Sequence, residues 1–150
     1  MRAGKTILRV LLLLIALNAA QCRALAEEPV AVIVNRENEV RHIGEAEIRK
    51  MYTNSTLHWP DGQPVLLYDL VVQNRLRAVF SINILGKDAE RVAEEWAHLK
   101  ITNQAKNPPV TMKSEALIIK RVMTERGAIG YVSLSAVRNN PAVRVVFTIE

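Results

Sequence analysis

The apolar run Val30-Ala31-Val32-Ile33-Val34 is the feature that most restricts the fold of this chain. Polar residues do not alternate with the apolar ones, as they would in a strand with one face in water. A continuous run rich in β-branched residues is typical of a strand that is covered on both faces, as in a parallel sheet. We therefore expect this segment inside a layered domain in which helices cover a sheet.

Three other segments have strand-like patterns. Val65 to Tyr68 and Ala128 to Val132 are apolar, whereas apolar and other residues alternate from Val143 to Ile149, as on a half-covered strand near the edge of a sheet. Helical patterns lie between them. The order predicts an α/β domain with a mainly parallel or mixed central sheet that is flanked by helices.

The first helix should begin at Gly44. Glu47 is placed to reach back to the exposed first amide, and Ile43 and Ile48 have the spacing of a hydrophobic staple across the helix start. Asn74 can cap a second helix that runs to about Leu85 and ends at Gly86.

Two further helices have capping residues of their own. Asp88 can cap a helix in which Val92, Trp96 and Leu99 repeat at helical spacing. After the break at Asn107-Pro108-Pro109, Ser114 opens a helix that ends near Arg126. Its expected inward residues are Leu117, Ile118, Val122 and Met123.

Glycine and proline mark the connections. Trp59-Pro60-Asp61-Gly62 is typical of a turn. Gly127 stands where a helix would end in a left-handed residue, and Gly130, within an expected strand, indicates that a neighbouring backbone passes close by.

Residues 1–26 have the pattern of a cleaved secretory signal peptide. Arg2, Lys5 and Arg9 precede an apolar run, Val10 to Leu17, and Ala24-Leu25-Ala26 supplies the small residues of a cleavage site. The run is shorter than the roughly 18 residues of a spanning helix, which argues against an uncleaved anchor. We expect a soluble protein in the periplasm, with residues 27–150 as one domain.

Removal of this leader changes the charge balance. The chain has 20 Lys and Arg against 15 Asp and Glu, but four of the basic residues and none of the acidic ones lie in the leader, which leaves 16 against 15. This near-neutral balance gives no support to nucleic-acid or membrane-surface binding. The only cysteine, Cys22, also lies in the leader, so disulfides cannot stabilise the mature domain.

No catalytic arrangement is visible in the sequence. His42, His58 and His98 do not have the spacing of metal ligands on one helix face, and the motifs of nucleophilic elbows, phosphate loops and dinucleotide sites are absent. The adjoining Glu94 and Glu95 point different ways on a helix and cannot form an acid/base pair. We expect neither an enzyme nor a metal or cofactor site.

A binding site has a better candidate. In open α/β sheets, ligands lie beyond the carboxyl ends of strands, where helix amino-termini favour anions. The loop from Asp69 to Asn74 is such a place, and Arg75 and Arg77 add positive charge beside it. The alternative is that Asn74 is only a cap and that both arginines form a solvated face.

Several of these pieces together resemble the phosphate-binding periplasmic proteins of ABC transporters, most closely their short, single-lobe substrate-binding-like members. The shared order, within about residues 30 to 137, is an apolar strand, Met51-Tyr52-Thr53-Asn54, Trp59-Pro60-Asp61-Gly62, Arg77-x-x-Phe80, Trp96 and Gly127-Ala128-Ile129-Gly130-Tyr131-Val132. The resemblance implies one lobe of a type 2 periplasmic-binding-protein fold, whereas full receptors of this kind enclose an oxyanion between two lobes.

The chain departs from this family at the expected ligand contacts. The family's Ser-Gly-Thr falls on Asn74, Arg75 and Leu76, so a hydroxyl and a close backbone approach are lost, and only Arg77 carries over cleanly. Asn54 stands where the family has glycine, but asparagine tolerates the left-handed conformation.

Two functions follow from the resemblance and its departures. The first is weak or degenerate binding of phosphate or another small oxyanion at Asp69, Asn74, Arg75 and Arg77, together with an ABC-type permease. The alternative is an interaction or signalling module that has no small ligand and instead binds a periplasmic sensor or other protein, or pairs with itself.

Overall fold

A five-stranded mixed sheet forms the centre of the computed structural model, which describes residues 28–150. The expected signal peptide and Cys22 lie outside the described residues. The strands are β1 (Val30–Asn35), β2 (Leu66–Leu70), β3 (Val110–Met112), β4 (Ala128–Ser133) and β5 (Val143–Ile149), in the order β3-β2-β4-β1-β5. The expected α/β class with a mixed sheet is confirmed.

Strand direction corrects one expectation. The strand β1 is buried along its whole length, as its apolar run predicts, but it is antiparallel to both of its neighbours, β4 and β5. Only β2 has parallel partners, β3 and β4. A continuous apolar run reports that both faces are covered, and this can occur with either strand direction.

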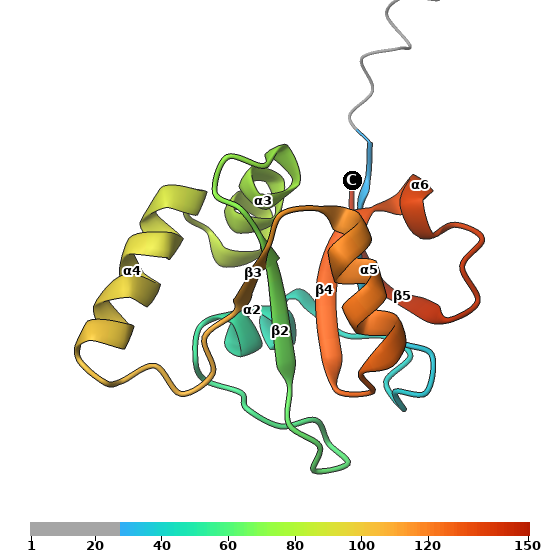
Figure 1. Cartoon of the computed structure of the whole chain (residues 1–150), viewed down its shortest axis with the longest axis horizontal. Coiled ribbons are helices and arrows are strands. Elements are labelled where there is room, and N and C mark those ends of the chain that lie inside the picture. The colour runs from blue at the N-terminus through green and yellow to red at the C-terminus, as the bar shows by residue number, and fades with distance from the viewer. Residues whose placement is uncertain (1–27) are drawn as a thin grey trace, which may run out of the picture.

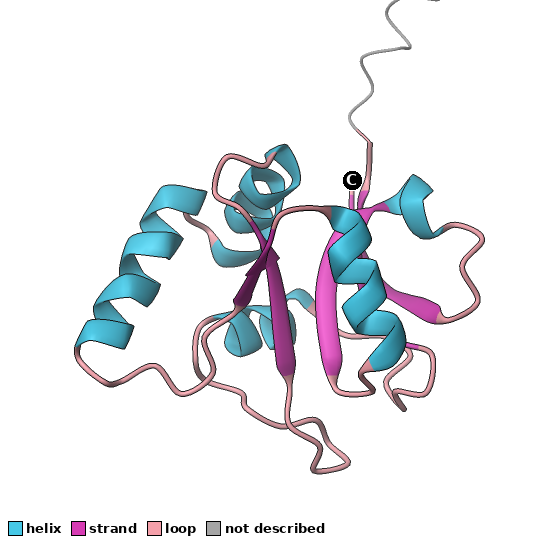
Figure 2. Ribbon diagram, viewed as in Figure 1, coloured by secondary structure: helices cyan, strands magenta, loops and turns pink. Residues whose placement is uncertain are grey.

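Helices cover both faces of the sheet, as Figures 1 and 2 show. The helix α5 (Glu115–Thr124) packs on the near face of the sheet, next to β4 in this view, and α2 (Glu45–Tyr52) and α3 (Arg75–Phe80) lie behind the sheet. The π-helical turn η1 (Ser81–Leu85) continues α3 directly. The helix α4 (Ala89–Ile101) lies to the side, beyond β3, and the short α6 (Leu134–Val137) follows β4.

The residues predicted to cap the helices occupy the N-cap positions in the structure. Asn74 Oδ1 accepts from Leu76 N at 2.8 Å, Asp88 Oδ1 accepts from Arg91 N at 2.7 Å, and Ser114 Oγ accepts from Leu117 N at 3.4 Å. Gly44 caps α2, and Gly86 ends η1 in the left-handed conformation with φ 70°. Local sequence is sufficient for these predictions because a cap is recognised by its own first turn.

The structure contradicts several details of α5 and of the glycines. Ile118 and Val122 are buried, but Leu117 and Met123 are 42% and 43% exposed, and Arg126 lies beyond the end of the helix at Thr124. Positive φ occurs at the described glycines Gly62 and Gly86, so Gly127 does not end the helix in a left-handed conformation.

Close packing instead requires glycine both at position 127, just before β4, and at position 130, within β4. A Cβ atom at Gly127 would collide with the carbonyl oxygen of Pro64. At Gly130 a Cβ atom would lie 2.5 Å from Cγ2 of Ile118 on α5 and 3.6 Å from the backbone oxygen of Tyr68, so the side chain is closer than the expected neighbouring backbone. Gly130 therefore lets α5 pack directly on the sheet.

Asn54 confirms the expectation that asparagine can replace glycine in its turn. Its φ is 65°, and its side chain donates to Gln104 O at 2.9 Å and accepts from Lys106 N at 2.8 Å. The left-handed turn thus ties the end of α2 to the loop that leads into β3.

Two elements and one irregularity were not expected from the sequence. The strand β3 follows the two prolines directly, and α6 follows β4. The strand β5 is at the edge of the sheet, as expected, but the register with β1 shifts between Val32 and Ile33, so that Val146 is buried while Val145 and Phe147 are only partly buried. A bulge of this kind interrupts alternation.

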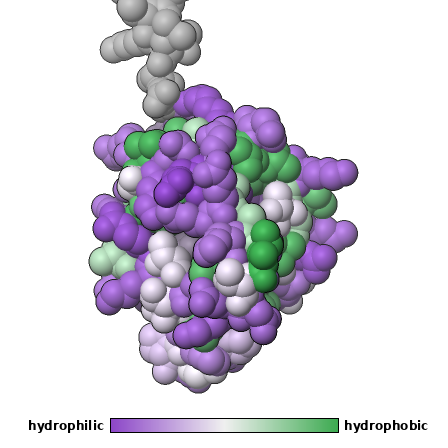
Figure 3. Space-filling view, turned by 90° about the vertical axis from the view of Figure 1, so that its left-hand side faces the viewer, coloured by the Kyte–Doolittle hydropathy of each residue, from purple (hydrophilic) through white to green (hydrophobic). Residues whose placement is uncertain are grey.

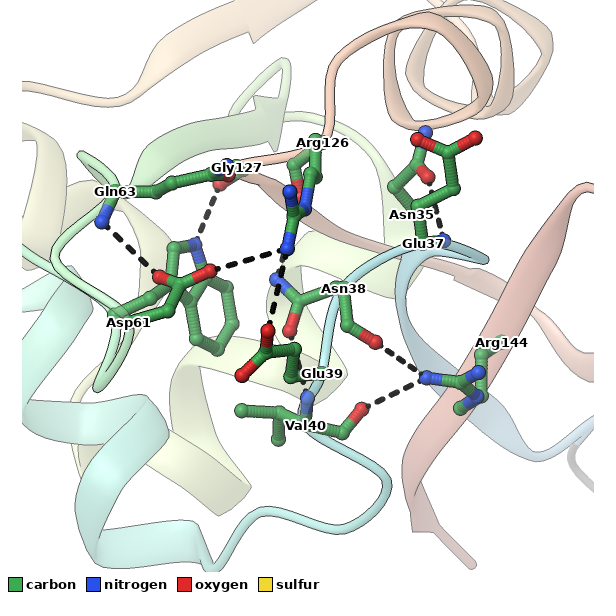
Figure 4. Close-up of polar contacts among 11 residues, drawn as sticks. Asn35, Glu37, Asn38, Glu39, Val40, Asp61, Gln63, Arg126, Gly127 and Arg144 are labelled. Carbon is green, nitrogen blue, oxygen red and sulfur yellow. Dashed lines mark hydrogen bonds and ion pairs between the residues drawn. The ribbon is translucent and has the colours of Figure 1, made fainter.

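The amino end of the sheet, where β2 and β4 begin and β1 ends, is held by hydrogen bonds to backbone carbonyls. Trp59 Nε1 donates to Gly127 O at 2.8 Å, and Asn35 Nδ2 donates to Val122 O at 2.8 Å. Figure 4 shows this region, in which Arg144 donates to the carbonyl of Asn38 at 2.6 Å and to that of Val40 at 3.2 Å.

The ion pairs of Arg126 at the same end are long, and the arginine is exposed. Arg126 Nη2 lies 3.5 Å from both Glu39 Oε1 and Asp61 Oδ2, and the Arg126 side chain is 42% exposed (Figure 4). The predicted turn at residues 59–62 closes with a 2.9 Å bond from Gly62 N to Trp59 O. No helix within residues 28–150 has the length and apolar character needed to cross a bilayer.

Candidate functional site

A buried ion pair lies at the carboxyl end of the sheet, where β2, β3 and β4 end and β1 begins. Asp69 is the fourth residue of β2 and is 5% exposed; Arg77, on the first turns of α3, is 4% exposed. Arg77 Nη1 contacts Asp69 Oδ2 and also donates to Leu70 O at 2.7 Å. The structure therefore brings together two of the four residues of the candidate site, and each neutralises the other.

Tyr131 of β4 completes this pair. Its hydroxyl donates to Asp69 Oδ1, and Leu70 N donates to the same carboxylate oxygen at 2.9 Å. The ring of Tyr131 stacks on Phe80 at 4.0 Å with an interplanar angle of 5°, and Tyr52 meets Phe80 edge-on at 4.9 Å. The aromatic cluster thus fixes the hydroxyl that orients Asp69.

Burial controls the protonation of this group. Burial raises the pKa of Asp69 above its ordinary value, while the charge of Arg77 and the hydrogen bonds from Tyr131 and Leu70 N act in the opposite direction. Burial also raises the pKa of Tyr131 well above that of a free phenol, and the nearby charge of Asp69 raises it further. Tyr131 therefore keeps its proton at neutral pH and remains a hydrogen-bond donor to Asp69.

Arg77 has one donor that this network does not use. Its Nε is buried and has no hydrogen-bond partner among residues 28–150. A buried donor without a partner costs about 1–3 kcal/mol, so such groups are rare and each needs an explanation, for which a bound water, an ion or a functional role are the usual ones. Arg77 and Asp69 also line a cavity of about 170 Å³ between α3, α4 and β3.

Asn74 and Arg75 occupy different positions from this pair. Asn74 is the N-cap of α3, so its Oδ1 serves Leu76 N. Arg75 is exposed at the first position of α3, which places its positive charge at the surface of the carboxyl end. The four candidate residues therefore form a buried pair and a surface helix start, and do not converge on one point.

Two carboxylates occupy other donors at the carboxyl end. Glu115 Oε2 accepts from both the N–H and the hydroxyl of Ser133, each at 2.6 Å, and Glu28 Oε1 accepts from Ser135 N at 3.1 Å. The hydrogen bond from the Ser135 side chain lowers the pKa of Glu28, which keeps that group ionised. The protein's own anions thus satisfy donors where β4 enters α6.

The histidines lie away from this site. His42 and His58 line a cavity of about 470 Å³ near α2, together with Glu47, and His98 is on the last turns of α4. Within the part of the chain that the structure describes, no three His, Cys, Asp or Glu side chains are grouped closely enough to hold a metal ion.

Sequence reasoning missed three residues around the buried pair: Tyr131, Thr111 and Lys100. Thr111 is the direct partner of Asp69 in the register of β2 and β3, and Lys100 reaches the same cavity from α4. A strand prediction for residues 110–112 could have placed Thr111 beside Asp69. The contact from Tyr131 depends on the pairing of β2 with β4, which no local pattern specifies.

Comparison with known proteins shows which solved structures have a similar fold. Neither a protein-family model nor a curated protein matches the sequence. Solved structures do match, among them a protein from Clostridium perfringens described as the substrate-binding protein of a phosphate ABC transporter with bound phosphate, at TM-score 0.63 and 21% identity over 79% of this chain.

Two other similar structures are PstS from Borrelia burgdorferi, at TM-score 0.62 and 14% identity, and an ABC-type phosphate transport receptor from Vibrio cholerae, at TM-score 0.59 and 13% identity. Each match covers 79% of this chain but only 44%, 46% and 45%, respectively, of the Clostridium, Borrelia and Vibrio proteins. The chain thus spans less than half the length of these proteins. The resemblance inferred from the sequence is confirmed at the level of the fold, which this chain shares with phosphate ABC-transporter substrate-binding proteins.

Proposed function

We propose that this protein is a substrate-binding-like protein that binds phosphate or another small oxyanion weakly in the periplasm, after removal of residues 1–26 as a signal peptide. The observation that carries the proposal is the position of Arg77, a buried cation at the carboxyl end of a sheet whose fold is shared with phosphate-binding receptors. The ligand contacts proposed are Asn74, Arg75 and Arg77, with Asp69 holding Arg77 in place. Transfer to an ABC-type permease would follow binding.

Weak binding is expected because much of the donor capacity is already used. Arg77 Nη1 serves Asp69 and Leu70 O, and Glu115 occupies both donors of Ser133. An anion that enters must therefore rely on the donors that remain and on the exposed charge of Arg75. An open surface also leaves the anion partly hydrated, which reduces the gain from each contact.

Calorimetric titration of the purified protein with phosphate and with sulfate tests this proposal. We expect dissociation constants in the millimolar to high micromolar range, and weaker binding in Arg75→Gln. The matched control is Arg41→Gln, which removes an exposed arginine from the other end of the sheet. Absence of heat and of any thermal shift at millimolar phosphate and sulfate would contradict the proposal.

A second candidate function is an interaction or signalling module without a small ligand. The observation that favours it is that the protein's own carboxylates occupy donors at the carboxyl end of the sheet: Glu115 accepts from Ser133, and Glu28 accepts from Ser135. These donors are therefore bonded as they would be in a site that already holds an anion. Light scattering after size exclusion would detect a self-associated form, and crosslinking in cells would detect a sensor or other envelope partner; a monomer that recovers no partner would contradict this candidate.

A further inference from the structure

The cavity between α4 and the edge strand β3 has the composition of a site for an organic anion. Its polar side chains are Asp69, Arg77, Lys100 and Thr111, and its apolar wall contains Trp96 and Val72, among others. Ligand sites commonly combine a mostly apolar lining with a few polar groups that fix orientation.

The charges in this cavity favour an anion. Asp69 is the only acidic residue on the lining, and it is already neutralised by Arg77 and bonded by Tyr131 and Leu70 N. Lys100 has no ion-pair partner among the described residues that would cancel its charge. The lining therefore has a net positive charge next to a buried guanidinium.

The buried Nε of Arg77, which has no partner among the described residues, favours a ligand-binding cavity over an incidental packing defect. Arg77 lines the cavity and is 96% buried. Asp69 and Thr111 are paired in the register of β2 and β3, so their side chains leave the sheet on the same face. Thr111 thus adds a hydroxyl group to the part of the cavity lining that contains the positive charges of Arg77 and Lys100.

The size and walls of the cavity select the ligand class. A volume of about 170 Å³ is several times the roughly 30 Å³ that a water molecule takes in the liquid, which is enough for an oxyanion with a short substituent. The buried ring of Trp96 offers that substituent an apolar surface. The outer face of the molecule on the α4 side is mainly hydrophilic, with separate apolar patches (Figure 3).

We propose that this cavity binds a small organic anion, such as a phosphonate or phosphate ester, with its oxyanion against Arg77, Lys100 and Thr111 and its apolar group against Trp96. This inference rests on the proposed function and names the ligand class and two contacts, Lys100 and Thr111, for it. Inorganic phosphate lacks the apolar group and therefore binds more weakly than an alkylphosphonate.

The test compares propylphosphonate with inorganic phosphate in the wild type, Lys100→Met and Lys120→Met, by calorimetry and tryptophan fluorescence. Lys120 is an exposed lysine on α5, outside this cavity, so Lys120→Met makes the same chemical change elsewhere. We expect propylphosphonate to bind more tightly than phosphate and to change the fluorescence. Lys100→Met should weaken its binding about three- to fivefold, and Lys120→Met should leave it unchanged.

A Trp96→Phe variant assigns the signal. It should abolish the fluorescence change while calorimetry still detects binding, because Trp59 lies at the other end of the sheet.

Three results would overturn the inference. Unchanged propylphosphonate binding in Lys100→Met, equal weakening in Lys120→Met, or phosphate binding at least as tight as propylphosphonate would each exclude the cavity as described. If phosphate binding is instead weakened by Arg75→Gln in any of these cases, the proposed function stands without this inference. If neither anion binds the wild type at millimolar concentration, both proposals fail.

Discussion

The two ends of the sheet use polar groups in opposite ways. At the amino end, side chains such as Trp59, Asn35 and Arg144 donate to backbone carbonyls, and the ion pairs of Arg126 are long and exposed. At the carboxyl end, a charged pair, Asp69 and Arg77, is almost completely buried. Neutral donors such as Trp59 and Asn35, and the partly exposed Arg144, bond carbonyls without burying an ion pair. A fully buried charge, in contrast, must keep its partner.

This difference distinguishes scaffold residues from candidate-site residues within the motifs that resemble the receptor family. Trp59 and Gly127 contact each other, so these widely spaced motif residues form one structural lock at the amino end. Arg77 and Tyr131 meet through Asp69 at the other end. The two ends therefore predict different responses to mutation.

The largest effect should come from Arg77→Met. It leaves Asp69 buried without its cation, and breaking a buried pair in this way costs about 3–5 kcal/mol of unfolding free energy. The double variant Asp69→Asn/Arg77→Met removes both charges and should recover part of that loss. Urea denaturation of both variants measures it; a single variant as stable as the wild type would show that the pair does not contribute to folding.

Trp59→Phe should have the next largest effect, at the amino end. It removes the 2.8 Å hydrogen bond to Gly127 O, which keeps its bond from Leu66 N at 3.0 Å, so the lost bond costs about 0.5–1.5 kcal/mol in addition to lost packing. Trp96→Phe is the matched control, because Trp96 is also buried but makes no such bond among residues 28–150. Equal destabilisation of the two variants would show that the hydrogen bond from Trp59 to Gly127 O does not stabilise the fold.

The capping residues show which parts of the fold local sequence can predict. Asn74, Asp88 and Ser114 each serve an amide within their own first turn, so sequence alone is sufficient. The direction of β1 and the contact of Gly127 with Pro64 depend on segments far away in the chain. The sequence predicted neither: β1 is antiparallel to its neighbours, and Gly127 is not left-handed. A pattern reports that a position is buried or that it excludes a side chain, but not which distant segment is responsible.

The candidate site follows the same division. Asp69, Asn74, Arg75 and Arg77 lie close in sequence, so the strand-to-helix connection could be proposed as one site. The structure divides them because Asp69 lies in the buried part of β2 and Arg77 on the buried side of α3, whereas Asn74 caps this helix and Arg75 is on its exposed side. Tyr131 could not be predicted, since it reaches Asp69 only after β2 pairs with β4, and Lys100 reaches the cavity only through the packing of α4.

A smaller effect is expected in the pH dependence of stability. Because the pKa of Asp69 is raised in the folded state, its contribution to stability is fully present below the ordinary value of 3.8 and is lost as pH rises through the folded pKa. Relative to Asp69→Asn, the wild type should therefore lose stability as pH increases above about 3.8. Urea denaturation of both proteins at several acidic pH values measures the difference; a rise with pH would show that Arg77 outweighs burial.

The smallest effect should come from Arg126→Gln at the amino end. Its two ion pairs are 3.5 Å long and exposed, and such pairs contribute about 0–1 kcal/mol. Salt should reduce even this difference between variant and wild type. A loss as large as that of Arg77→Met would remove the distinction between the two ends.

The most direct test of anion binding at the carboxyl end is an amide chemical-shift map of the protein during titration with inorganic phosphate. We expect concentration-dependent shifts at residues 69–77, at the carboxyl end of the sheet, with none at the turn of residues 59–62 or at Gly127. Shifts confined to the amino end, or no shifts at millimolar phosphate, would contradict it.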